Sequence, residues 1–141
     1  MYLIDTNVVS ELRRKARANS NVTRFFDRLT ASSAQIFVTA ITVGELRRGV
    51  ELLRHRGDAA QAALLETWLT SVLEEYGANV LSMDVDAAQI WGRLCVPDSA
   101  HAIDKQIAAI ALLYDLTLVT RNTSDFLGTG VKSIDPFVEI P

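Results

Sequence analysis

Cysteine, proline and long apolar runs are all scarce in this sequence. Cys95 is the one cysteine in 141 residues and so forms no disulfide within the chain, which favours a reducing cytoplasm. We expect its thiol to be buried in the core. The chain has three prolines, and no stretch rich in proline, glycine or serine divides it. We therefore expect a single domain spanning residues 1–141.

No apolar run approaches the roughly 20 residues that cross a membrane. The longest runs are short, such as residues 107–113, which Tyr114 and Asp115 interrupt. No basic residues precede the apolar residues at the N-terminus, which argues against a signal peptide. We therefore expect a soluble protein without membrane attachment.

The composition supports a folded core. Hydrophobic residues make up 49% of the chain, and a chain of this length buries about 68 to 70% of its unfolded surface. Disorder over most of the chain is therefore excluded. The chain has 14 Lys and Arg against 17 Asp and Glu, which gives a formal net charge of −3.

Short runs of β-forming residues alternate with helical patterns along the whole chain. Such alternation predicts an α/β fold, with a parallel sheet of about five strands sandwiched between helices. The predicted strands are residues 2–4, 36–38, 80–81, 116–119 and 131–134.

Apolar residues at helical spacing predict three helices after residue 57. One runs from Asp58, as its N-cap, to Tyr76, with Gly77 as its stop. A second follows Asp84. In the third, a core stripe is expected from Ile103, Ile107, Ile110 and Tyr114, with Asp104, Ala108 and Ala111 on the flank beside a crevice.

The predicted helix over residues 42–55 has two partly apolar faces. One face carries Val43, Leu46, Val50 and Leu53, and the roughly opposite face carries Ile41, Glu45, Arg48 and Leu52. Such a helix is often covered both by its own core and by a second surface. A partner subunit in a homodimer is one candidate for that cover.

Acidic residues follow several of the predicted strands. The carboxyl ends of parallel strands meet at one edge, where ligands bind in open sheets. Carboxylates gathered there repel one another unless a cation neutralises them, and oxygen ligands suit Mg²⁺ or Mn²⁺. The candidates are Asp5, Glu45, Asp84, Asp86, Asp104 and Asp125.

Each of these acids also has an ordinary structural interpretation. Asp5 and Asp84 suit helix N-caps, and Asp86 and Asp104 suit the first turn of a helix. Glu45 could pair with Arg48 on an exposed helix face, and Asp125 could belong to a turn. Position alone does not select four acids from the six.

Other catalytic sites lack their residues. No glycine-rich phosphate loop is present. Two histidines, His55 and His101, with one cysteine give no zinc-ligand set. Neither histidine is placed for serine catalysis, since Ser99 shows no sharp nucleophile turn, and a surface position is expected for both.

Four segments of the chain resemble the signature segments of PIN-domain ribonucleases, in family order. The closest resemblance is to the toxin subunits of VapBC-type toxin–antitoxin pairs. The segments are residues 3–12 (LIDTNVVSEL), 42–46 (TVGEL), Asp104 with 107–109 (IAA), and 118–126 (LVTRNTSDF). The resemblance covers essentially the whole chain.

The resemblance implies an acidic quartet that is both catalytic and metal-binding, and it sets Asp84 and Asp86 aside. The quartet is Asp5, Glu45, Asp104 and Asp125, with Thr6, Asn7 and Asn122 as supporting polar residues. One departure from the family pattern is Lys105, where a small residue is common. We expect its ammonium group to point outward toward RNA phosphate rather than to pair with Asp104.

The implied activity is metal-dependent endoribonuclease cleavage. One or two Mg²⁺ or Mn²⁺ ions would lower the pKa of a bound water, direct it at a phosphodiester and stabilise the developing charge. No covalent enzyme intermediate is expected. The implied partners are RNA, a cognate antitoxin protein and a second copy of the chain.

The net negative charge is unusual for an RNA-binding enzyme, because Lys and Arg supply most of the affinity for phosphate. Basic residues are, however, clustered near the two signature helices, at residues 13–17, 47–48 and 54–56. The candidate RNA contacts are Arg13, Arg14, Arg48 and Lys105, although a solvated face is the usual role of such clusters.

Two alternatives use the same acids differently. A haloacid-dehalogenase-type phosphatase also carries an acid after its first strand, but it requires a second acid two residues later, where this chain has Asn7. A receiver-like or binding-only α/β domain would hold the acids without hydrolysis. An RNA cleavage assay with and without EDTA, beside a phosphatase assay, separates the three.

Overall fold

The computed structural model describes residues 1–139, which contain a five-stranded parallel sheet in the order β3-β2-β1-β4-β5. The strands are β1 (Tyr2–Ile4), β2 (Ile36–Thr39), β3 (Val80–Leu81), β4 (Thr117–Val119) and β5 (Ser133–Ile134). The five predicted strands are confirmed, with β5 shorter than its predicted run. β1 is central because it pairs with β2 on one side and with β4 on the other.

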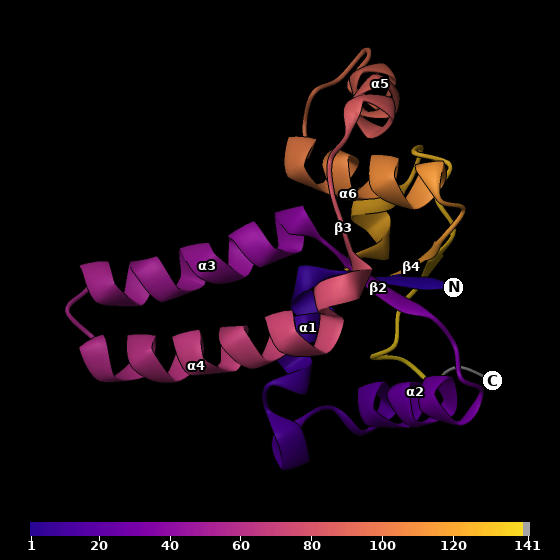
Figure 1. Cartoon of the computed structure of the whole chain (residues 1–141). Coiled ribbons are helices and arrows are strands. Elements are labelled where there is room, and N and C mark those ends of the chain that lie inside the picture. The colour runs from indigo at the N-terminus through magenta and orange to yellow at the C-terminus, as the bar shows by residue number, and fades with distance from the viewer. Residues whose placement is uncertain (140–141) are drawn as a thin grey trace.

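Within residues 1–139, six α-helices surround this sheet, as Figure 1 shows. They are α1 (Thr6–Leu12), α2 (Ser20–Ala31), α3 (Ala40–His55), α4 (Ala59–Tyr76), α5 (Val85–Leu94) and α6 (Ala102–Leu113). Short 3₁₀ turns lie at η1 (Lys15–Arg17), η2 (Gly77–Asn79) and η3 (Thr123–Phe126). Helices α5 and α6 cover one face of the sheet, α1 and α2 lie toward the other, and α3 and α4 form an antiparallel pair that extends sideways (Figure 1).

Polar side chains at the N-caps fix where most of these helices begin. A capping oxygen accepts a hydrogen bond from a backbone N–H that has no partner within the helix. The predicted caps Asp58 and Asp84 are confirmed, since they accept from the N–H groups of Gln61 and Ala87. Side chains of Asp5, Asn19 and Thr39 cap α1, α2 and α3 in the same way.

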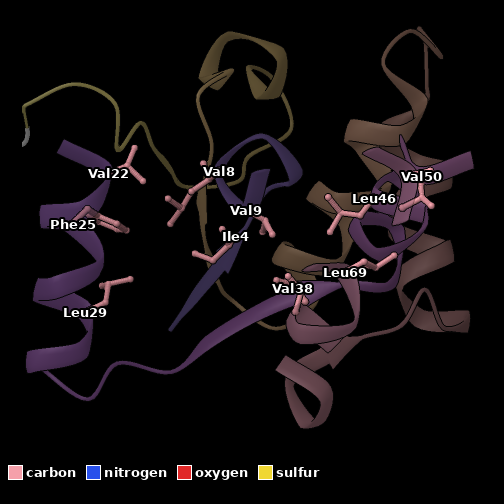
Figure 2. Close-up of a cluster of buried hydrophobic side chains, with 13 residues drawn as sticks. Ile4, Val8, Val9, Val22, Phe25, Leu29, Val38, Leu46, Val50 and Leu69 are labelled. Carbon is pink, nitrogen blue, oxygen red and sulfur yellow. The ribbon is translucent and has the colours of Figure 1, made fainter. Parts of the chain in front are cut away.

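Successive strand residues feed two separate cores, because side chains along a strand point alternately to opposite faces. Ile4 and Val119 join the core beneath α1 to α4, part of which is drawn in Figure 2. Leu3 and Leu118 join the core beneath α5 and α6. Burial on both faces explains why these strands are continuously apolar.

The predicted core stripe of α6 is wrong at both ends. Ile103 is 52% exposed and Tyr114 is 41% exposed, whereas Ala108 and Ala111, expected on the flank, are fully buried. A helix of 12 residues is about 18 Å long, and the three-residue strands below it span only about 10 Å. The middle of α6 is therefore enclosed, and its ends extend beyond the sheet.

Two other expectations need correction. Ile41 packs against the core beneath α5 and α6, so only part of the second face of α3 is open, including the half-buried Leu52. Cys95 is half-buried at the C-terminal end of α5, outside the fully buried core. The periodicity of a helix identifies an apolar face but does not show which other element covers it.

Within residues 1–139, no helix combines the length and the apolar character needed to cross a bilayer.

Candidate functional site

The strand order reverses at the central strand, because β1 leads to β2 on one side and β4 lies on the other. Residues after these strands meet at the carboxyl edge of the sheet. They line a cleft of about 240 Å³ formed by Asp5, Thr6, Asn7, Glu45, Asp104 and Asn122. The structure thus brings three predicted acids and the three predicted supporting residues to one cleft.

Asp5 is the most enclosed of these acids, with 5% of its surface exposed. Its Oδ1 accepts from the backbone N–H of Thr6 at 2.8 Å, which caps α1. Its Oδ2 accepts from the Thr120 hydroxyl at 2.7 Å and from the Asn7 amide at 3.1 Å. Asp5 is therefore a helix cap and a cleft residue together, and neither of its two sequence interpretations excludes the other.

Burial raises the pKa of Asp5, because the ionised carboxylate loses water. Hydrogen bonds from Thr120, Thr6 and Asn7 oppose this effect by stabilising the charged form, and the negative charge of Asp125 adds to it. The pKa stays above its ordinary value of 3.8 after these opposing effects. A bound cation would relieve this cost.

Glu45 is held by hydroxyl groups rather than by a basic residue. Its Oε1 accepts from the Thr6 hydroxyl at 2.7 Å, and the Thr42 hydroxyl lies 3.1 Å from that of Thr6. Thr39 extends the chain of hydroxyls, with its oxygen 3.4 Å from that of Thr42. Among the described residues Glu45 forms no ion pair with Arg48, so the surface-pair interpretation of Glu45 is wrong.

Asp104 lines the cleft, whereas Asp125 is not among its lining residues within the described part of the chain but lies close to Asp104, and both acids are half-buried. Desolvation raises the pKa of Asp104, and the charges of Asp5, Asp125 and Glu45 raise it further. The nearby His101 acts in the opposite direction. This dependence on Asp5, Asp125 and Glu45 indicates that the four predicted acids share one electrostatic environment.

Asn7 and Thr120 join the two central strand ends. Besides Asp5, the Asn7 amide donates to the Thr120 hydroxyl at 3.3 Å, and its Oδ1 accepts from the backbone N–H of Arg121 at 3.1 Å. The Thr120 hydroxyl also accepts from the backbone N–H of Asn122 at 3.1 Å. Thr120 was not among the predicted site residues, although its place directly after a buried strand could have identified it.

His101 is a second residue near the site that was not among the predicted site residues. It was expected as a surface histidine, and its side chain is 56% exposed. Its Nδ1 nevertheless lies 3.6 Å from Oδ2 of Asp104. Ligand atoms of His101, Asp104 and Asp125 all lie within 4.8 Å of one another, a spacing that could hold a metal ion. His101 precedes Asp104 by three positions, and residues at this spacing on a helix are neighbours, so the sequence contained a signal for this contact.

The two remaining acids serve as ordinary helix residues. Asp84 caps α5, and Asp86 lies in its first turn. Neither of them lines the cleft among the residues that the structure describes.

Comparison with known proteins accounts for this arrangement. The sequence model of the PIN domain matches residues 2–129. The chain belongs to the PIN-domain family. The phosphatase and receiver-like alternatives are not favoured by this match, and Asn7, where the phosphatase would need an acid, donates to Asp5 instead.

Relatives of this PIN domain include toxin FitB of Neisseria gonorrhoeae, which is 33% identical over 97% of this chain and 99% of its own. A chain in the crystal structure of FitAcB from that organism matches 97% of this chain and 99% of its own length, with a TM-score of 0.83. The VapC ribonuclease Y4jK of Sinorhizobium fredii is 29% identical over 97% of this chain and 98% of its own. One chain of a solved toxin–antitoxin complex from Klebsiella pneumoniae is 25% identical to this chain. The match covers 99% of this chain and 100% of that chain, with a TM-score of 0.65.

The basic residues proposed to contact RNA lie in other surroundings in this PIN domain. The Arg13 guanidinium lies 6.0 Å from the centre of the Trp68 ring, and Arg14 pairs with Glu11 at 3.4 Å. Arg48 is exposed on α3. The Lys105 ammonium donates to the backbone carbonyl of Asp98 and, among the described residues, forms no ion pair with Asp104. Among residues 1–139, none of these four lines the acidic cleft.

The donor chemistry of the cleft fits a divalent metal ion. Carboxylate oxygens are hard ligands suited to Mg²⁺ or Mn²⁺. Burial, together with neighbouring carboxylates, raises the pKa values of Asp5 and Asp104, so a bound cation would stabilise their charged forms. Asp5, Glu45 and Asp104 border the cleft, and Asp104 with Asp125 belongs to the group spaced for one ion. The residues present therefore fit the metal dependence of PIN nucleases.

Proposed function

We propose that this PIN domain, over residues 1–141, is a metal-dependent endoribonuclease and the toxin of a toxin–antitoxin pair in the cytoplasm. The observation that carries the proposal is the gathering of carboxylates from separate parts of the chain around one cleft. Residues 140 and 141 of the proposed domain lie outside the described residues. The ribonuclease name of the Sinorhizobium relative and the toxin name of the Neisseria relative support the activity.

The roles of the residues follow from their contacts. Asp5, Glu45, Asp104 and Asp125 are the proposed ligands of Mg²⁺ or Mn²⁺, which when bound activates water and offsets the charge of the phosphodiester. Thr6 fixes Glu45, and Asn7 fixes both Asp5 and the backbone after β4. Asn122 lines the cleft, where its amide can reach a substrate phosphate.

Cleavage of RNA by the purified, partner-free protein tests the activity. We expect cutting with Mg²⁺ or Mn²⁺ and none in EDTA. Asp5→Asn and Asp104→Asn each remove one ligand charge and should lower the rate at least about 100-fold, equivalent to about 2.7 kcal/mol. A matched control is Asp86→Asn, which changes an acid outside the cleft. Equal cutting by the wild type and both cleft variants would indicate a contaminating nuclease.

An antitoxin protein is the proposed partner. The solved toxin–antitoxin complex from Klebsiella supports this assignment, and the unbalanced negative charge of the cleft supplies a physical reason. An Arg side chain from the antitoxin could place a cation among the carboxylates and form charge-assisted hydrogen bonds. Co-expression with a cognate antitoxin protein should yield a complex that cuts RNA more slowly than the free protein.

A homodimer remains a proposal that depends on the open part of the α3 surface. Leu52 is half-buried beside exposed Arg48 and His55, and a second copy could cover this surface. Light scattering at micromolar concentration should give a dimer mass, and Leu52→Glu should shift it toward the monomer. A monomeric mass for the wild type would contradict the proposal.

A further inference from the structure

His101 stands immediately before α6 and beside the outer acids of the cleft. Its Nδ1 lies 3.6 Å from Oδ2 of Asp104. Asp104 is three residues further along the chain, and Asp125 reaches the same place from η3. A nitrogen donor therefore joins two carboxylates from separate elements.

The spacing of these three side chains suits one ion. Their ligand atoms all lie within 4.8 Å of one another. Two atoms bound to the same ion at about 2.0 to 2.2 Å can be separated by at most about 4.4 Å. Three atoms bound to one ion at these distances lie on average no more than about 3.8 Å apart, so side-chain adjustments of about 1 Å would bring all three atoms to one ion.

The backbone around His101 is anchored, while its imidazole stays accessible. The carbonyl oxygen of His101 accepts from the backbone N–H of Lys105 at 2.9 Å. The next carbonyl, that of Ala102, accepts from the indole N–H of Trp91 at 3.1 Å. The side chain is 56% exposed, so an incoming ion can reach the ring.

We propose that His101 supplies a nitrogen ligand to the metal ion held by Asp104 and Asp125, and that this ligand makes the site select Mn²⁺ over Mg²⁺. Mg²⁺ strongly prefers oxygen ligands, whereas imidazole binds transition-metal ions well. The inference rests on the proposed metal-dependent function. It assigns to this chain a mixed nitrogen and oxygen site on the outer side of the cleft.

The two histidines of the chain, His55 and His101, make the test specific. Tag-free protein would be prepared with ¹⁵N only in its histidine side chains, loaded with Mn²⁺ without RNA, and studied by pulsed electron paramagnetic resonance. We expect a directly coupled ¹⁵N signal in the wild type and in His55→Ala. The same signal should be lost in His101→Ala and in His101→Gln, which retains a polar side chain without a ring nitrogen.

Calorimetric titration provides the second measurement. His101→Ala should weaken Mn²⁺ binding by about tenfold and change Mg²⁺ binding by less than about threefold, because only the former ion gains from imidazole. Equal weakening of both ions would overturn the selectivity. It would instead indicate that His101 acts only by positioning Asp104.

RNA cleavage by the same preparations separates this inference from the proposed function. Metal-dependent cleavage without histidine coupling in the wild type overturns the His101 ligand and leaves the ribonuclease intact. Coupling that persists in His101→Ala also overturns it. Protein that neither binds Mn²⁺ nor cuts RNA overturns the proposed function as well.

Discussion

The four acids divide into two pairs that are held in different ways. The inner acids, Asp5 and Glu45, accept hydrogen bonds from Thr6, Asn7 and Thr120. The outer acids, Asp104 and Asp125, are half-buried, and among the described residues the Asp104 carboxylate accepts no hydrogen bond. Its nearest basic neighbour is His101.

Burial is the largest cause of the raised pKa of both Asp5 and Asp104, but the effects that accompany burial differ between the two acids. Burial dominates for Asp5, and hydrogen bonds offset part of its effect. For Asp104, burial acts together with three neighbouring negative charges. The inner acids are therefore part of the folded framework, whereas the outer acids are restrained mainly by their own backbone. Substitutions should destabilise the protein on the inner side and stabilise its metal-free form on the outer side.

The largest expected effect is on stability at the inner side. Asp5→Ala removes the α1 cap and leaves the fully buried Thr120 hydroxyl without its carboxylate partner. The expected loss is about 2 kcal/mol, which lowers the Tm by about 4 to 8 °C in a domain of this size. Thermal melts in EDTA measure it. An unchanged Tm would show that Asp5 is not part of the framework.

The next effect concerns the hydroxyl that holds Glu45. Thr6→Val keeps the side-chain shape but removes the donor at 2.7 Å, so Glu45 loses its orientation. Metal affinity should fall about tenfold, as is common when a ligand loses its supporting hydrogen bond. Titration calorimetry with Mn²⁺ measures the change. Thr6→Ser, which retains a hydroxyl, is the matched control and should bind nearly as well as the wild type.

At the outer side the sign of the stability effect reverses. Asp104→Asn removes one like charge, and after solvent screening the relief should be about 1 kcal/mol, so the variant should melt about 2 to 4 °C higher than wild type in EDTA. Mn²⁺ should then raise the wild-type Tm more than that of the variant, because metal stabilises the folded state that binds it. A variant that melts lower and keeps the full metal shift would remove Asp104 from the site.

The smallest effect is the pH dependence of the Tm difference between Asp104→Asn and the wild type. The folded-state pKa of Asp104 lies above its ordinary value of 3.8, so the folded protein retains this proton to higher pH than the unfolded chain does. The contribution of Asp104 to stability is therefore most favourable below pH 3.8 and is lost as the pH rises through the raised pKa. The Tm gap between Asp104→Asn and wild type should be under about 1 °C near pH 4 and should widen toward pH 7. A constant gap would exclude this ionisation as its cause.

Much of the fold could be predicted because the spacing of apolar residues and the positions of helix-capping residues indicate the same helices and strands. The alternation of apolar runs with helices gave the five strands, and Asp58 and Asp84 marked where α4 and α5 begin. Helix α2 was not predicted, although Val22, Phe25, Phe26 and Leu29 have helical spacing and Asn19 caps it. Exposure was less predictable: Ile103 and Tyr114 fit a core stripe, but the sheet beneath α6 is too short to cover them.

The grouping of the site acids could be predicted less directly than the fold. Strand ends suggested five candidate acids and the flank of a predicted helix suggested Asp104, and only the family resemblance separated Asp84 and Asp86 from the rest. His101 could not be assigned, because its contact with Asp104 depends on the geometry of the first turn of α6. Thr120 belonged to a signature segment, but its bond to Asp5 joins residues 115 positions apart.

The distance along the chain between Asp5 and Thr120 affects when the cleft can form during synthesis. Asp5 is synthesised near the beginning of the chain, but its partner Thr120 follows 115 residues later. At about 5 to 20 residues per second, the ribosome needs roughly 6 to 23 seconds to supply that partner. The central strand β1 also waits for β4 over the same interval. A nascent chain therefore holds its first acid without a complete cleft, and activity can begin only when synthesis is nearly finished.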